Sequence, residues 1–196
     1  VARAEATARL LAEHDQLLVE DRSVPEVEGC AVLLEALSMP TENVYTANEL
    51  VRVVVGNEVD SSTIAGAVSA ARANARAIRD SLSQDTFEAL NSAHLALSRG
   101  IAFTASPGVA LHRVLERLLV VNGVVDWTMP RDEAYHFMVL GRELERIDMV
   151  GRLLAIRHDE VWPASGPAAA LRAAGALSPF LRTGKPITAL DVRRFL

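Results

Sequence analysis

Arg3-Ala4-Glu5-Ala6-Thr7-Ala8-Arg9-Leu10-Leu11, near the start of the chain, recurs toward its other end as Arg146-Ile147-Asp148-Met149-Val150-Gly151-Arg152-Leu153-Leu154. Arginines stand at the same positions in both copies, and each copy has an acid four residues before its second arginine. On a helix this spacing places the carboxylate one turn N-terminal to the guanidinium, the favourable orientation for an ion pair. Both copies are therefore predicted to be helices.

The second copy falls within a predicted helix from about Arg131 to His158 that is apolar almost all the way round. With about 100° between successive residues, one apolar stripe contains Leu140, Leu144, Ile147, Gly151 and Leu154. The opposite face mixes three charged residues with three apolar ones, namely Arg142, Glu145 and Arg146 with Met149, Leu153 and Ile156. Since such a face is poorly suited to full solvation, we expect partly buried charges that have partners.

Helix signals follow one another along the rest of the chain. Thr46 and Glu49 have the spacing of a capping box, which favours a helix rather than a strand through Val51 to Val55. Two further helices are predicted before it, one that ends at about Glu20 and one from Glu26 to Leu37. Three more are predicted in the middle of the chain: one after Asp60-Ser61-Ser62, one that begins at Asp85, and one from Ser106-Pro107 to Asn122-Gly123. The last two begin at Ser165-Gly166-Pro167 and after a cap formed by Thr188 and Asp191. There is no hairpin signal or glycine-rich phosphate loop, so the predicted fold is an all-α, multi-helix bundle, mostly antiparallel, with charged, semi-buried helix faces.

Composition limits the class of protein. With 196 residues, 50% of them hydrophobic, the chain can form a substantial core, and we expect a single domain over residues 1–196. A formal charge of −5 argues against a nucleic-acid binder. Cys30 is the only cysteine and no apolar run is long enough to span a bilayer, so we expect a cytoplasmic protein with no membrane partner. The chain begins inside the repeat and ends soon after a helix start, and we interpret it as a fragment truncated at both ends.

Arg72, Arg76 and Arg79 are spaced so that they share one face of a helix. They are the best anion-binding candidates from the residues alone, because guanidinium groups bind phosphate or carboxylate through paired hydrogen bonds. The structural alternative is that Arg72 and Arg76 form ion pairs across the bundle with Glu145, Asp148 and Glu5. This alternative is at least as well supported, since semi-buried charges require partners.

Metal and cofactor chemistry find little support in the sequence. A di-iron bundle needs two Glu-x-x-His pairs, and Glu133 with His136 is the only one present. No nucleotide-binding glycine motif or nucleophile elbow occurs. We therefore expect no metal and no cofactor, and we interpret Cys30 as a small buried hydrophobic residue.

The arginine and acid pattern resembles the Alpha-E domain, a bacterial all-helical family with a Glu-Arg motif. The resemblance is carried by segments along nearly the whole chain: Ala2 to Leu11, Ala71 to Arg79, Leu82 to Asn91, Met129 to Arg131 and Leu140 to Asp148. It implies an all-helical fold and an association with ATP-grasp ligases, which join a carboxylate to an amine, and with transglutaminase-like proteins. It also implies a role in peptide synthesis or modification.

This chain departs from the family pattern at several positions. The family usually has Glu at Ala2, Asn at Ala6, Glu at Ala73, and Trp at Phe87 and Tyr135, whereas Glu145-Arg146 is intact. Within the resembling segments, the candidate ligand-binding residues are Arg72, Arg76, Arg142, Arg146, Asp148, Arg3, Glu5, Arg9, Asn74 and Asn91.

Three functions are open at this point. The favoured hypothesis is a non-catalytic accessory module that acts with an ATP-grasp ligase, with a transglutaminase-like protein as a further partner and a peptide as ligand. The second is an autonomous enzyme, with Glu145 as general acid or base and Arg142, Arg146 and Arg72 binding carboxylate or phosphate. The third is a structural scaffold that oligomerises through the alanine-rich segment Ala168 to Ala176.

Overall fold

The computed structural model describes residues 1–21, 23–42, 46–99, 106–156, 161–163 and 165–196. All regular secondary structure in these residues is helical, which confirms the predicted all-α fold. The α-helices are α1 (Ala2–Glu20), α2 (Glu26–Ala36), α3 (Ala47–Gly56), α4 (Ile64–Ala77), α5 (Gln84–Ser98), α6 (Pro107–Thr128), α7 (Glu133–Ala155), α9 (Gly166–Ala173), α10 (Leu177–Leu181) and α11 (Ala189–Phe195). One 3₁₀ turn, η1 (Arg79–Ser81), follows α4.

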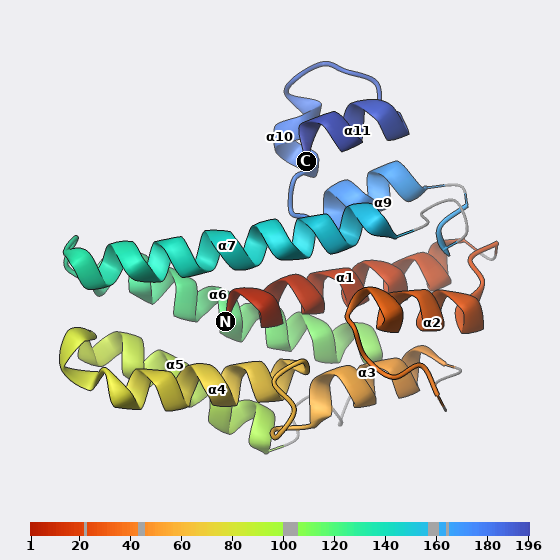
Figure 1. Cartoon of the computed structure of the whole chain (residues 1–196). Helices are drawn as coiled ribbons and strands as arrows, with labels where there is room; N and C mark the ends of the chain where they lie inside the picture. The colour runs from red at the N-terminus through yellow and green to blue at the C-terminus, as the bar shows by residue number, and fades with distance from the viewer. Residues whose placement is uncertain (22, 43–45, 100–105, 157–160, 164) are drawn as a thin grey trace.

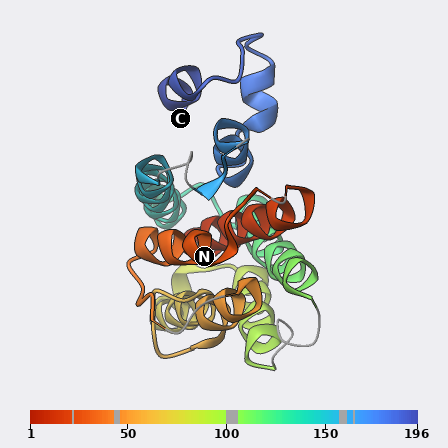
Figure 2. The same cartoon turned by 90° about the vertical axis from the view of Figure 1, so that its right-hand side faces the viewer.

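Helix α1 occupies the middle of the bundle. It packs against α4 and α6 on one side and against α7 and α9 on the other (Figure 2). The neighbours α4, α5 and α6 alternate in direction, as an antiparallel bundle requires, whereas α1 and α7 run the same way (Figure 1). The two copies of the repeat therefore lie on adjacent parallel helices.

The buried apolar residues form one contiguous cluster that extends from Ala4 to Val192. On α1, the small side chains of Ala4 and Ala8 are 1% and 0% exposed, so neighbouring helices approach the α1 backbone closely. Trp162 and Phe180, the largest fully buried side chains, extend this core toward the C-terminal helices.

Local capping signals are confirmed at two helices. The Thr46 side chain accepts a hydrogen bond from the Glu49 backbone N–H at the start of α3, and Thr188 accepts one from Asp191 at the start of α11. Val51 to Val55 are accordingly helical. These caps satisfy backbone donors that the first turn leaves unpaired.

The predicted end of a helix at Asn122-Gly123 is wrong, since α6 continues to Thr128. A glycine inside a helix costs only about 1 kcal/mol relative to alanine. Val121 and Val125, which flank this position, are buried in the bundle and compensate for that cost. The Asn122 side chain does not cap the helix but donates a hydrogen bond to Glu5 on α1.

Helix α7 buries the face that mixes charges with apolar residues. Met149 and Leu153 are buried, and the side chains of Arg142 and Glu145 are 27% and 34% exposed, so the prediction of partly buried, partnered charges is confirmed for these two, whereas Arg146 is 62% exposed. The purely apolar stripe instead faces outward, and Leu140, Leu144 and Ile147 are 52%, 57% and 69% exposed. In this orientation Glu145 pairs with Arg3 of α1. Of the predicted range Arg131 to His158, residues 157 and 158 lie outside the described residues.

The alanine-rich segment, proposed above as an oligomerisation surface, packs within the chain. Helix α9 contacts α1, and Ala169, Ala170 and Ala173 are 0%, 1% and 5% exposed. Their small side chains therefore serve close packing of α9 on the core. In the same segment Ala168, Ala174 and Ala176 are half-buried and Gly175 is exposed.

Two further observations concern Cys30 and the membrane. Cys30 is fully buried, and burial raises the pKa of its thiol to about 11, as expected for a small buried hydrophobic residue. Among the helices of the described residues, none combines the length and apolar character needed to cross a bilayer.

A buried carboxylate fixes α9 to α1. Glu13 is 6% exposed and accepts a hydrogen bond from Arg172 Nε at 2.7 Å. That bond is the main reason why the pKa of Arg172 lies above its ordinary value. Removing one partner of such a pair leaves an uncompensated buried charge, which is more costly than removing both.

Arg172→Met is expected to lower the free energy of unfolding by about 3 kcal/mol, because Glu13 stays buried without its cation. The double variant Glu13→Leu/Arg172→Met removes both charges and is expected to be more stable than Arg172→Met alone. Urea unfolding followed by circular dichroism measures both. Equal stability of the single variant and the unmodified chain would contradict the pairing.

His14 is enclosed where α1, α2 and Trp162 meet. It is 1% exposed, and its Nδ1 accepts a hydrogen bond from Trp162 Nε1 at 3.2 Å. A side chain at Gly29 would place its Cβ 2.6 Å from His14 Cε1, so glycine makes the space for the ring. Burial lowers the pKa of His14 to about 4, with a smaller opposing effect from Glu26. The folded protein therefore holds this ring neutral.

Because the pKa of His14 is lower in the folded protein than in the unfolded chain, its contribution to stability is complete above about pH 6.5 and decreases as the pH falls toward 4. Between pH 6.5 and 5 we expect a loss of about 2 kcal/mol in the free energy of unfolding from this group. His14→Gln should flatten the pH dependence in this interval, whereas His112→Gln, at a histidine whose side chain is 74% exposed, should leave it intact. Urea unfolding at several pH values tests this, and identical profiles for both variants would refute it.

Candidate functional site

Each copy of the repeat forms the ion pair that its spacing predicts. Arg9 Nη2 lies 2.9 Å from Glu5 Oε1 on α1, and Arg152 Nε lies 2.8 Å from Asp148 Oδ2 on α7. Both pairs join residues four apart, one helical turn from each other. The sequence prediction for both helices is thus confirmed at the level of side chains.

A further ion pair joins the two repeats across the interface of α1 and α7. Arg3 Nε and Nη2 donate to the two carboxylate oxygens of Glu145 at 2.9 and 2.7 Å. The hydrogen bond with Glu145 is also the main reason why the pKa of Arg3 is raised. Planar, bidentate pairs of this kind are the strongest and most specific that arginine makes.

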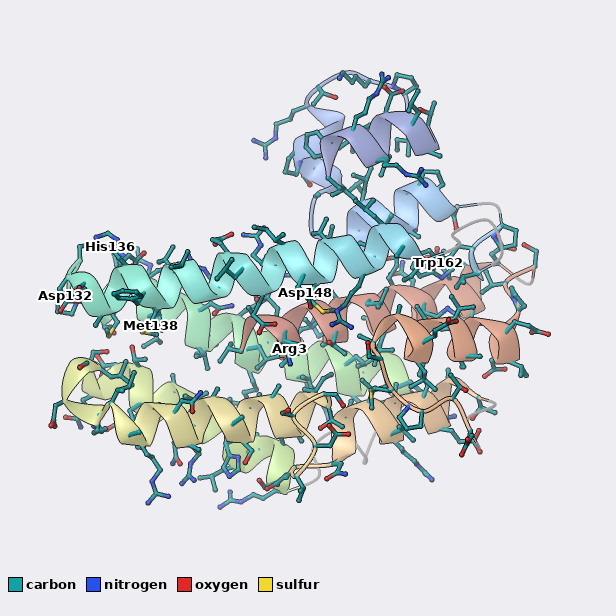
Figure 3. The ribbon with its side chains drawn as sticks, viewed as in Figure 1. Arg3, Asp132, His136, Met138, Asp148 and Trp162 are labelled. Carbon is teal, nitrogen blue, oxygen red and sulfur yellow. The ribbon has the colours of Figure 1, made fainter. Side chains whose placement is uncertain are left out.

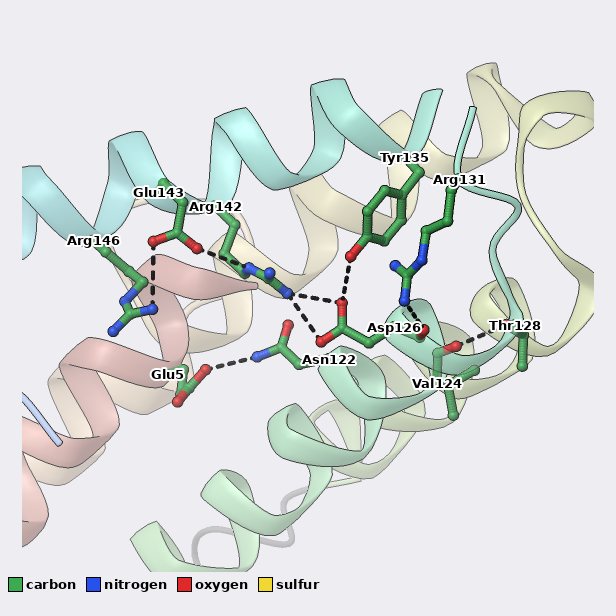
Figure 4. A network of polar contacts seen from close by, with 10 residues as sticks. All are labelled: Glu5, Asn122, Val124, Asp126, Thr128, Arg131, Tyr135, Arg142, Glu143 and Arg146. Atoms are coloured by element: carbon green, nitrogen blue, oxygen red, sulfur yellow. Dashed lines mark hydrogen bonds and ion pairs between the residues drawn. The ribbon is translucent and has the colours of Figure 1, made fainter. Parts of the chain in front are cut away.

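A pocket of about 370 Å³ lies between the repeated helices, beside this ion pair. Its walls come from α1, α6, α7 and the C-terminal end of α9, and Figure 4 shows the polar side chains that reach into the region from α7, α6 and α1. The charged and amide residues that line it are Glu5, Arg9, Asn122, Asp126, Arg142 and Arg146. Its apolar lining includes Ala2, Ala6, Leu10, Leu119, Met149 and Leu153.

The two carboxylates of the pocket are already engaged. Glu5 accepts hydrogen bonds from Arg9 at 2.9 and 3.0 Å and from Asn122 Nδ2 at 2.7 Å. Asp126 accepts from Arg142 Nη1 at 3.2 Å and from the Tyr135 hydroxyl at 3.2 Å (Figure 4). Neither acid is left to balance an additional cation.

The two arginines that α7 contributes differ in their partners. Burial alone would lower the pKa of Arg142, but hydrogen bonds and charge interactions with Asp126 and Glu143 raise it overall. Arg146 has a weaker attachment, since its Nη1 lies 3.4 Å from Glu143 Oε2 and its side chain is 62% exposed. Glu143 also accepts a hydrogen bond from Arg142 Nε at 3.2 Å, so Arg142 and Arg146 share this carboxylate.

The structure brings together some of the candidate ligand-binding residues and separates others. Glu5, Arg9, Arg142 and Arg146 line the same pocket. Arg3 is engaged beside it by Glu145. The remaining candidates lie elsewhere, namely Asp148 in its pair with Arg152, Arg72, Arg76 and Asn74 on α4, and Asn91 on α5.

The predicted ion pairs of Arg72 and Arg76 with Glu145, Asp148 and Glu5 are wrong. These acids pair with Arg3, Arg152 and Arg9 instead. Arg72 Nε donates to Asn91 Oδ1 at 2.7 Å and links α4 to α5. Arg76 is exposed, and Arg79 stacks over the Phe87 ring at 4.6 Å from its centroid. Arg72 and Arg79 thus contact residues of α5, and Arg79 lies in η1 because α4 ends at Ala77.

A second cavity, of about 320 Å³, lies on the other side of the α1 N-terminus. Its lining is mainly apolar, and the polar residues in it are Asn74, Thr86, Asn122, Arg142 and Glu145. Both oxygens of Glu145 accept hydrogen bonds from Arg3. Arg72, which the enzyme hypothesis placed beside Glu145, is bonded to Asn91. Of the three arginines that the enzyme hypothesis placed with Glu145, Arg142 lines this cavity beside it, whereas Arg72 does not.

Three residues of the pocket network were not identified from the sequence. Asn122 was interpreted as a helix end, and Tyr135 was noted only as a departure from the family pattern. Asp126 carries no motif, and only the packing of α6 against α7 reveals that it faces Arg142. A prediction that the helix continues through residues 122–128 would have placed Asn122 and Asp126 one turn apart on the same face.

The possible metal ligand His136 lies on the exposed surface near the N-terminal end of α7 (Figure 3). Its ring packs edge-on against the Tyr135 ring, and the two ring centroids are 5.6 Å apart. Within the described ranges, no group of three or more histidine, cysteine, aspartate and glutamate side chains is arranged to hold a metal ion.

Comparison with known proteins identifies one family. The model of the Alpha-E family, described as a predicted alpha-helical domain with a conserved ER motif, matches residues 1–196. No curated protein and no solved structure matches the chain. The dipeptide Glu145-Arg146 stands at the interface of the two repeats, with Glu145 binding Arg3 and Arg146 lining the pocket. The match covers the whole chain, which therefore belongs to the Alpha-E family.

Proposed function

We propose that this chain is an accessory module of a peptide synthesis or modification system, in which it holds a peptide ligand for an ATP-grasp ligase that joins a carboxylate to an amine. The observation that carries this proposal is the pocket between the two repeated helices. The family's implied association with ATP-grasp and transglutaminase-like proteins supplies the class of partner.

The lining of the pocket supports a peptide as ligand. Three arginines and an amide offer donors, and Leu10, Leu119, Met149 and Leu153 offer an apolar surface. Pockets that combine an apolar wall with a few placed polar groups are typical of small-ligand sites, and 300 to 1,000 Å³ is roughly their usual size. A terminal residue of a peptide presents a carboxylate, an amide and a side chain to such a surface.

The charge pairing supports holding rather than catalysis. A general acid or base must reach the proton that it transfers. In the pocket, Glu5 and Asp126 each accept hydrogen bonds from two other side chains of the protein. Beside it, both carboxylate oxygens of Glu145 accept hydrogen bonds from Arg3. These acids orient arginines and leave the guanidinium groups to contact a ligand.

In a ligation assay with a purified ATP-grasp ligase from the same organism, adding the chain is expected to raise the rate of peptide ligation. Arg142→Gln should reduce this stimulation about tenfold, since it removes a charge-assisted hydrogen bond donor from the pocket. Arg117→Gln is the matched control because Arg117 lies on the exposed surface of α6, in a Glu-Arg dipeptide outside the pocket. The readout is ATP consumption together with the mass of the peptide product. A ligase that neither binds the chain nor responds to it at several salt concentrations would overturn the proposal.

A further inference from the structure

Arg146 differs from the other arginines of the repeats in its pairing. Each of the others has an acid at 2.7 to 2.9 Å: Arg3 with Glu145, Arg9 with Glu5, and Arg152 with Asp148. Arg146 is 3.4 Å from Glu143, an acid that it shares with Arg142. Its guanidinium therefore retains most of its capacity to donate hydrogen bonds.

The repeat shows which position would complete its pairing. Helices α1 and α7 run in the same direction, and equivalent repeat positions line the same pocket, Ala6 with Met149 and Leu10 with Leu153. In this register Arg3 of the first copy binds Glu145, the residue that precedes the arginine of the second copy. The reciprocal pair would join Arg146 to the residue that precedes Arg3, which is Ala2.

Ala2 and Arg146 both line the pocket, but a methyl group stands where the reciprocal carboxylate would be. The lining carries three arginines and two acids, and both acids are bound by Arg9, Asn122, Arg142 and Tyr135. Arg146 has only a shared acid, Glu143, which lies outside the lining at 3.4 Å, so among the arginines of the lining it is the most weakly paired, and Ala2 borders the same cavity. A guanidinium in this situation favours an incoming carboxylate, which it binds through two parallel hydrogen bonds.

We propose that the pocket takes the C-terminal residue of a peptide, with Arg146 binding its carboxylate in the place left by Ala2. This inference rests on the proposed function and names its ligand. The side chain of that residue would lie on Leu10, Leu119, Met149 and Leu153, which an inorganic anion would leave unused. A pocket of about 370 Å³ is near the lower end of the size of small-ligand sites, roughly 300 to 1,000 Å³, and is too small for a folded partner.

Three probes and two variants test the assignment by isothermal titration calorimetry on the full chain. The probes are acetyl-alanyl-leucine with a free carboxylate, the same peptide as its C-terminal amide, and inorganic phosphate. The free acid is expected to bind at least about tenfold more tightly than the amide or phosphate, because a charge-assisted bidentate contact contributes more than 1.4 kcal/mol. Arg146→Gln should abolish that preference, and Arg117→Gln should preserve it.

Ala2→Glu provides the decisive variant, because it places a carboxylate of the chain itself opposite Arg146. We expect this variant to melt at a higher temperature and to bind the free acid about tenfold more weakly than the unmodified chain. Equal binding of acid and amide, equal or tighter binding of phosphate, or unchanged binding in Arg146→Gln would each overturn the inference. These titrations contain no ligase, so they test peptide binding separately from the proposed function. If the peptide does not bind but the chain still stimulates the ligase, only this inference is wrong. If the peptide binds but the ligase is not stimulated, only the proposed function is wrong.

Discussion

Burial of a charged helix is the constraint on which this structure depends. Helix α1 is enclosed by α4, α6, α7 and α9, yet it carries Arg3, Glu5, Arg9 and Glu13. Charges removed from water destabilise a fold unless they are paired. The partners come from three surrounding helices and from α1 itself: Glu145 on α7, Asn122 on α6, Arg172 on α9, and the internal pair of Glu5 with Arg9. The positions of the surrounding helices are thus tied to the charges of α1.

The same constraint accounts for the pocket. Pairing Arg3 with Glu145 fixes α1 and α7 side by side, with small α1 residues, Ala2 and Ala6, facing the interface. The end of α9 adds Ala173, Ala174 and Gly175. Side chains this small cannot fill the space that the arginines and their acids hold open, so a cavity remains where a protein interior would otherwise be close-packed. A cavity lined by both charge and apolar surface is suited to a ligand that carries both.

Short-range features were predictable from the sequence because their physics is local. The ion pairs four residues apart in both repeats and the caps at Thr46 and Thr188 depend only on helix geometry. Partners across the bundle were not predictable, and Arg72 illustrates the reason. Its distance from Glu145 is set by the packing of α4 against α1 and α5, and the nearer acceptor is Asn91. Asn122 was misjudged for the same reason, since tertiary packing outweighs the helix-ending tendency of an Asn-Gly pair.

The apolar stripe of α7 faces outward. A helix with one charged, mixed face and one apolar face normally buries the apolar one, because burial of each large apolar side chain contributes about 2 kcal/mol. Helix α7 does the opposite, with Ile147 69% exposed while Glu145 binds Arg3. In this orientation Glu145 pairs with Arg3, and Met149 and Leu153 are the α7 side chains that enter the core. Glu145 and Arg146 are adjacent in sequence but project on different sides of this interface, so the first stabilises the pairing of the helices and the second is free to serve the pocket.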